Sequence, residues 1–202
     1  RGSGTINISG SAQITGNSST LDGGAILMGW GTINISDSAK INSNTASRWG
    51  GAICLRQDSN QSTTLYMRGG EISGNRASKE GGAVHVLDKD CQFFLYDGKI
   101  TGNTSGDGGA IYLNQEPSWL IMQGGEISGN TATGNGGGVY ITAPARSANS
   151  IAVRSRITKP ATMAAAFIST QQQRPAEDRK QAPRAEQHGS GKANNVYLPP
   201  AR

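Results

Sequence analysis

The chain has 202 residues, of which 29 are glycine and only 5% are aromatic, and its formal net charge is +5. This length fits one domain, but the composition excludes a conventional globular core, so a regular backbone arrangement must organise the chain. The charge is local: eight Arg or Lys residues and three acids lie from Ala143 to His188, and the rest of the chain has eleven of each sign. A neutral main body offers no basic face to phosphates, so no nucleic-acid partner is expected.

Cysteine content and hydropathy exclude further classes. Cys54 and Cys91 are too few for a disulfide scaffold and lack metal-ligand spacing. The sequence therefore predicts no metal and no cofactor, and it leaves open whether the two cysteines are free or paired. No apolar run is long enough to cross a membrane, so no direct membrane insertion is expected. The opening "RGSGTINIS" is no signal peptide and already belongs to a repeat, which indicates a fragment without its signal or anchor.

Residues 1–142 form five repeat units. The tetrapeptides ITGN, INSN, ISGN, ITGN and ISGN begin at Ile14, Ile41, Ile72, Ile100 and Ile127, at spacings of 27, 31, 28 and 27 residues. Each is followed by a glycine block: GGAIL, GGAIC, GGAVH, GGAIY or GGGVY. Five matches of both blocks make the repeat a strong signal.

Each unit contains three short runs in which side chains alternate between two faces, and none of them can bury its apolar side alone. Stacked units solve this problem, because parallel strands about 4.8 Å apart form a narrow apolar interior and pair every backbone group with the next coil. We therefore predict an all-β protein, a right-handed parallel β-helix (solenoid) of five recognisable coils of about 28 residues with an irregular C-terminal segment. A left-handed hexapeptide helix is disfavoured by the longer period.

One asparagine recurs at the same place in every unit. Stacked amides can hydrogen-bond along the solenoid axis, so these residues predict a structural ladder. The ladder residues are Asn17, Asn44, Asn75, Asn103 and Asn130.

The "GGAI" and "GGEISGN" blocks together resemble the right-handed parallel β-helix repeat proteins of bacterial cell surfaces. They are similar to the GGA(I/L/V) repeats of chlamydial polymorphic membrane proteins over Arg1 to Thr142, although isoleucine stands where that family's FxxN motif has phenylalanine. The resemblance implies an extracellular or cell-surface location and an adhesin or autotransporter-like passenger role.

Residues 143–188 break the repeat with a basic segment rich in Ala, Arg and Gln. The run from Ala164 to Ile168 stands 28 positions after GGGVY, and codons read from the third base of Met163 onward permit GGGV followed by Tyr or His. One interpretation is a coil translated in a shifted frame, and the other is a genuine disordered segment. Residues 189–202, which include "GSGKANNVYLP", resemble the truncated end of a repeat array.

One outward column contains the residues with the most distinctive chemistry. Cys54 and His85 fall at neighbouring positions and could form an activated thiolate, but no third residue is evident to orient the imidazole, so ordinary stacking is favoured. His85, Tyr112 and Tyr140 predict an outer aromatic strip that binds sugar rings or a protein, with plain strand preference for aromatics as the alternative.

Two charged columns have simpler explanations. Lys40, Glu71, Lys99 and Glu126 alternate in sign, as cross-strand ion pairs do. Asp22, Glu80 and Asp107 precede glycine pairs, where turn chemistry is favoured over a calcium site.

The regular coils favour a non-catalytic repeat module, a rigid rod for adhesion or ligand display whose partner is a carbohydrate or a host-surface protein. The alternative is a polysaccharide lyase or glycoside hydrolase of the pectate-lyase-like fold, which would need carboxylates that converge on one bond. The insertions at 56–64 and 86–92 carry no such cluster, so no catalytic residue is predicted. The sequence does not predict an oligomeric state.

Overall fold

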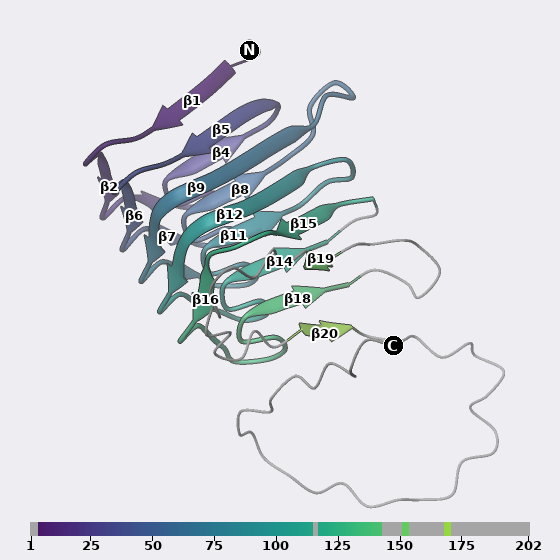
Figure 1. The fold of residues 1–202 in the computed structure, drawn as a ribbon. Coiled ribbons are helices and arrows are strands. Elements are labelled where there is room, and N and C mark those ends of the chain that lie inside the picture. Colours follow the sequence, from purple (N-terminus) through teal and green to yellow (C-terminus); the bar gives the residue numbers. More distant parts are fainter. Residues whose placement is uncertain (1–3, 115–116, 143–150, 154–167, 171–202) are drawn as a thin grey trace, which may run out of the picture.

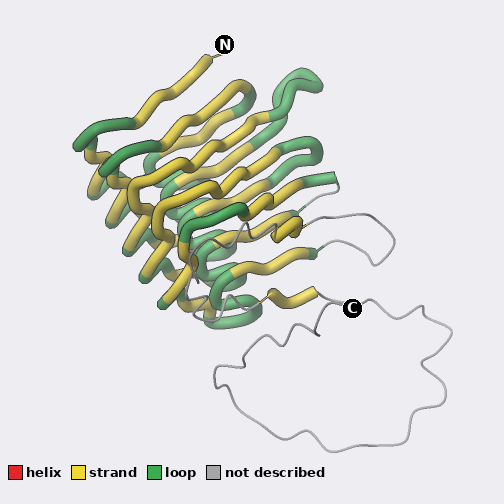
Figure 2. The backbone as a smooth tube through the Cα atoms, viewed as in Figure 1, coloured by secondary structure: helices red, strands yellow, loops and turns green. Residues whose placement is uncertain are grey.

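The computed structural model describes residues 4–114, 117–142, 151–153 and 168–170, which form a parallel β-solenoid (Figure 1). About five coils stack with a repeat of roughly 28 residues, and the described residues are strands, turns and loops with no helix (Figure 2). The predicted all-β parallel solenoid is therefore confirmed.

Three parallel sheets, here named A, B and C, run along the solenoid. Sheet A contains Gly4–Ile8 (β1), Gln13–Thr15 (β2), Gly31–Ile35 (β5), Lys40–Asn42 (β6), Thr63–Ser73 (β9), Gln92–Thr101 (β12), Trp119–Met122 (β15), Glu126–Ser128 (β16) and Ile151–Val153 (β19). Sheet B contains Ser18–Ser19 (β3), Thr45–Ala46 (β7), Arg76–Ala77 (β10), Thr104–Ser105 (β13) and Thr131–Ala132 (β17). Sheet C contains Ile26–Met28 (β4), Ile53–Leu55 (β8), Val84–Val86 (β11), Ile111–Leu113 (β14), Val139–Ile141 (β18) and Ile168–Thr170 (β20).

The core is a set of apolar columns between the sheets. Equivalent residues of successive coils are direct Cα partners, as in the row of Ile33, Leu65, Phe93 and Leu120, all of them fully buried. Alternation along each strand directs the intervening residues outward. Sheet A therefore presents a continuous outer surface whose side chains repeat once per coil.

The glycine pair at the entry to sheet C has two separate physical roles. The first glycine, as at Gly81 with φ +67°, adopts the left-handed region that other residues avoid. The second packs against the next coil, because a Cβ at Gly82 would lie 2.1 Å from the carbonyl oxygen of Gly109. Close stacking of the coils therefore requires both glycines.

The basic segment 143–188 lies largely outside the described residues. Its two described pieces continue the stack: Ile151 of β19 pairs with Leu120, and Ile168 of β20 pairs with Val139. The second pairing is one residue later than the 28-residue period of the shifted-frame interpretation, which places Phe167 opposite Val139. Both interpretations of this segment stay predictions, as does the array-ending motif at 189–202.

Candidate functional site: the outer face of sheet A

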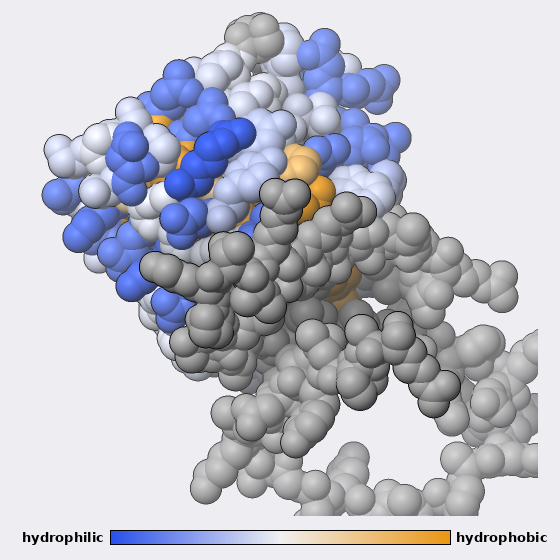
Figure 3. All heavy atoms as spheres, in the orientation of Figure 1, coloured by the Kyte–Doolittle hydropathy of each residue, from blue (hydrophilic) through white to orange (hydrophobic). Residues whose placement is uncertain are grey.

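Two surface features adjoin on the outer face of sheet A, an aromatic cluster and a charged groove. We call their combined surface the A face and define it by the outward residues Asp37, Lys40, Tyr66, Arg68, Glu71, Phe94, Tyr96, Asp97, Lys99 and Glu126. In the view of Figure 1, the surface over the early coils is largely hydrophilic with few hydrophobic spheres (Figure 3).

The aromatic cluster consists of three half-buried rings on β9 and β12. Tyr66 and Phe94 stack with their centroids 5.1 Å apart, and Phe94 and Tyr96 stack at 6.0 Å. The Arg68 guanidinium lies 4.7 Å from the Tyr66 ring centre and 5.1 Å from that of Tyr96. Because the ring faces are used on one another and on Arg68, ring edges and hydroxyl groups remain for a partner.

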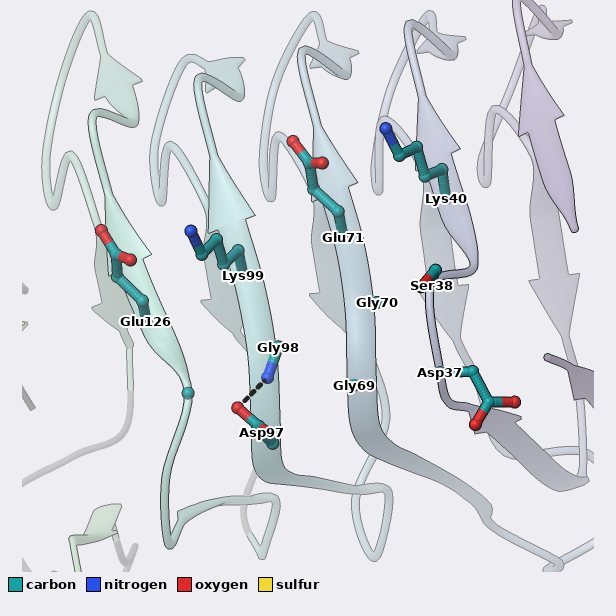
Figure 4. A pocket seen from close by; sticks show the side chains of 11 residues that line it. Asp37, Ser38, Lys40, Gly69, Gly70, Glu71, Asp97, Gly98, Lys99 and Glu126 are labelled. Carbon is teal, nitrogen blue, oxygen red and sulfur yellow. Dashed lines mark hydrogen bonds between the residues drawn. The ribbon is translucent and has the colours of Figure 1, made fainter. Parts of the chain in front are cut away.

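A groove crosses the coils beside this cluster (Figure 4). Its lining comprises Asp37, Ser38, Lys40, Gly69, Gly70, Glu71, Asp97, Gly98, Lys99, Gly125 and Glu126. Figure 4 shows Lys40, Glu71, Lys99 and Glu126 extending side by side from successive strands, with Asp37 and Asp97 at the opposite side.

The ion pairs expected within this charged column do not form. Lys40, Glu71, Lys99 and Glu126 are Cα partners along the solenoid, yet no ion pair of 4.0 Å or less joins any two of them. Glu126 instead accepts a hydrogen bond from the Ser128 hydroxyl at 2.6 Å. The charged ends therefore remain available to a partner.

The predicted aromatic strip belongs to a stack at sheet C that is buried. Trp49, His85 and Tyr112 stack in order with centroids 5.4 and 5.0 Å apart, and the Tyr140 ring lies 5.4 Å from that of Tyr112 at a tilt of 46°. His85, Tyr112 and Tyr140 are 0%, 5% and 4% exposed, and burial raises the pKa of Tyr112 to about 12. Little ring area is open to a ligand, and binding by these residues stays a prediction.

The same stack supplies the orienting group that sequence reasoning missed beside Cys54 and His85. Glu80 Oε2 lies 3.2 Å from His85 Nε2, and Cys54 is the Cα partner of His85. Cys54 is nevertheless fully buried and free, and burial raises the pKa of its thiol. Since the thiolate is the nucleophile, the pair is unsuited to covalent catalysis. Cys91 is also free and buried.

His85 makes stability depend on pH. Burial lowers its pKa below the usual 6.5, although the Glu80 hydrogen bond opposes that shift. The unfolded chain then binds the proton more readily, so stability is full above pH 6.5 and declines as the pH falls through the folded-state pKa.

We expect unfolding free energy, measured in urea, to decrease more between pH 7.5 and pH 5 in the parent chain than in His85→Phe, with a difference of no more than about 2 kcal/mol over this interval. Tyr112→Phe changes the neighbouring ring without removing the imidazole, and it should keep the parental pH dependence. A His85→Phe chain with an unchanged pH slope would contradict this assignment.

The acidic residues before the glycine pairs bind protein groups. Asp22 is buried and accepts two hydrogen bonds from Arg48, at 2.9 and 2.6 Å. Asp107 accepts hydrogen bonds from the backbone and side-chain nitrogens of Asn135. No group of three or more His, Cys, Asp or Glu residues suited to a metal ion occurs in the described part of the chain.

The asparagine ladder runs unbroken through the solenoid. Asn44 Oδ1 accepts from Asn17, Asn75 Oδ1 from Asn44, Asn103 Oδ1 from Asn75 and Asn130 Oδ1 from Asn103, at 2.9–3.0 Å. Each acceptor also takes the backbone N–H of the preceding asparagine at 2.9 Å. Asn44, Asn75 and Asn103 are fully buried, so their amides are structural, whereas Asn17 lies at the exposed end of the ladder.

Sequence reasoning did not single out the A-face aromatics. Strand alternation could have placed two of them, because Tyr66 and Phe94 directly follow the inward residues Leu65 and Phe93 and must therefore point outward. Tyr96 was harder to place, since the register of β12 against β9 shifts between Leu95 and Asp97.

These features define a repeat solenoid whose lateral surface exposes aromatic and charged side chains. Comparison with known families adds that residues 38–56, 97–114 and 125–142 match the Chlamydia polymorphic membrane protein repeat. The matched repeats and the solenoid fit a bacterial β-helix repeat surface protein similar to polymorphic outer membrane proteins. No curated protein and no solved structure matches it in the corresponding comparisons. No helix in the described part of the chain is both long and apolar enough to cross a membrane.

Proposed function

We propose that this chain is a rigid adhesion or ligand-display module of a secreted or surface-anchored, autotransporter-like protein, and that it binds its partner with the A face. The observation that carries the proposal is the half-buried cluster of Tyr66, Phe94 and Tyr96 beside unpaired charges on one continuous surface. Aromatic and arginine side chains supply much of the energy at protein interfaces.

A protein partner is favoured over a carbohydrate. Sugar rings stack on aromatic faces, but the faces of Tyr66, Phe94 and Tyr96 are already stacked on one another. Ring edges, phenol hydroxyls and charged groups suit the mixed chemistry of a protein surface instead. A host-surface protein is therefore our preferred class of partner.

The enzyme alternative gains no specific support. Glycoside chemistry requires two carboxyl groups placed about one scissile bond. In Figure 4 the side chains of Lys40, Glu71, Lys99 and Glu126 extend in parallel from successive strands and do not converge on a common point.

The cell-binding prediction uses the labelled chain and cultured epithelial cells. Tyr66→Ser/Tyr96→Ser should lower apparent affinity at least about tenfold, because truncating aromatic anchors removes most of an interface's energy. Arg68→Glu should also weaken binding while leaving every ring in place. Binding curves for folded variants, checked by circular dichroism, provide the measurement.

The matched control is Arg76→Ser/Lys79→Ser, which changes two exposed residues away from the A face, at and just after β10. It should bind as the parent chain does. Equal loss in the control and the aromatic variant, or no loss in either, would contradict binding by the A face.

A further inference from the structure

We propose that the A face is a self-recognition surface on which a second copy of this chain docks face to face, with its solenoid axis reversed. This inference rests on the proposed function only in using the same face. It names the partner as the chain itself.

The order of charges along the groove points to this partner. Lys40, Glu71, Lys99 and Glu126 occupy matching positions on β6, β9, β12 and β16. Their signs read plus, minus, plus, minus along the axis. The reversed order is the complement of the original, so an antiparallel copy of the row places opposite charges at all four positions.

A two-fold axis in the interface, directed along the strands and passing between β9 and β12, produces this match. It brings Glu71 opposite the partner's Lys99 and Lys40 opposite the partner's Glu126. Each contact occurs twice, because a two-fold interface uses the same patch of both subunits.

The residues of the aromatic cluster and the charged residues beside it also match across this two-fold axis. Arg68 and Asp97 are Cα partners on β9 and β12, and both are exposed. The two-fold therefore brings Arg68 opposite the partner's Asp97. Tyr66 and Phe94 are likewise Cα partners, so half-buried rings meet half-buried rings beside these charges.

Asp37 is the one charged residue of the A face that gains no opposite charge across the two-fold. The Asp37 carboxylate already accepts the Gly10 backbone N–H at 2.8 Å. Every other charged residue of the A face gains an opposite charge across the two-fold, whereas the single chain forms no ion pair of 4.0 Å or less among the four groove side chains.

The expected complex is a weak, salt-sensitive dimer. Exposed ion pairs contribute about 0–1 kcal/mol each, so affinity depends on several acting together around the rings. Salt near 1 M shortens the Debye length to about 3 Å and should largely abolish association.

Sedimentation equilibrium of the full chain, at about 0.05 M and about 1 M salt, tests the proposal with charge reversals. Glu71→Lys alone places lysine opposite the partner's Lys99, and Lys99→Glu alone places two acids together. Each should raise the dimer Kd roughly tenfold or more, because two attractive contacts become repulsive.

The combined variant Glu71→Lys/Lys99→Glu separates this proposal from pairing within one chain. Across the two-fold it restores opposite charges at all four positions, so dimerisation should return. Within one chain, the same variant places two lysines next to each other at positions 40 and 71 and two glutamates at positions 99 and 126. An equimolar mixture of the two single variants should likewise form a heterodimer.

A parent chain that is monomeric at about 1 mM in low salt would overturn self-recognition, leaving the face to a partner of another kind. Dimerisation that neither single reversal weakens, or that the double reversal fails to restore, would also overturn it. Because no cell is present in this assay, its failure leaves the cell-binding result intact.

Discussion

Replacing Asn75 by alanine is expected to lower the free energy of unfolding by about 4 kcal/mol, because several buried polar groups lose their partners at once. The backbone N–H and Nδ2 of Asn44 both donate to Asn75 Oδ1, and Asn75 Nδ2 donates to the Ile41 carbonyl and to Asn103 Oδ1. Asn75 is fully buried, so water does not replace these bonds. Urea titration followed by circular dichroism measures the loss.

Asn17→Ala is the matched control at the exposed end of the same ladder. Its side chain donates to Asn44 Oδ1 but lies in solvent, so the expected cost is about 1 kcal/mol or less. Equal costs for the two substitutions would show that the ladder does not contribute through buried hydrogen bonds.

Gly82→Ala is expected to destabilise the solenoid by about 3 kcal/mol or more, because overpacking against backbone cannot be relieved by a rotamer change. The added Cβ would lie 2.1 Å from the Gly109 carbonyl oxygen and 2.7 Å from the Thr104 backbone nitrogen. The coils would have to separate locally, which weakens the hydrogen bonds between them.

Gly29→Ala is the control for this prediction. Gly29 does not have a positive φ, and a Cβ there would lie 3.4 Å from Asp58 Cβ, an ordinary contact. Its thermal midpoint should stay near that of the parent chain, while that of Gly82→Ala should decrease by several degrees. A tolerated Gly82→Ala would contradict the close coil stacking described here.

Most of the fold could be predicted from the repeat, because each unit has the same pattern of glycine and apolar residues. Five glycine pairs set the corners, and alternating apolar residues set the inward faces, so the strand pattern followed directly from spacing. The long insertion at 56–64 changed the period without changing the register of β9 against β5. Codon sequencing across 142–189 would separate the two interpretations of the basic segment.

The site was harder to predict than the fold. Alternation assigns a side chain to the outside, but it does not show how neighbouring rings cover one another. His85 and Tyr112 are outward in their strands and still buried, since Trp49 and Tyr140 close the stack at either end. The sign pattern from Lys40 to Glu126 was visible in the sequence, but the absence of close ion pairs among these side chains required their geometry.

Site-specific photocrosslinking tests the role of the A face most directly. A photoreactive phenylalanine analogue would be placed at Phe94 on the A face and, separately, at Arg76 of β10 on sheet B. Illumination on epithelial cells should yield a crosslinked partner from position 94 and none from position 76, and a product of twice the chain mass would identify a second copy. Crosslinking from position 76 alone would contradict the account.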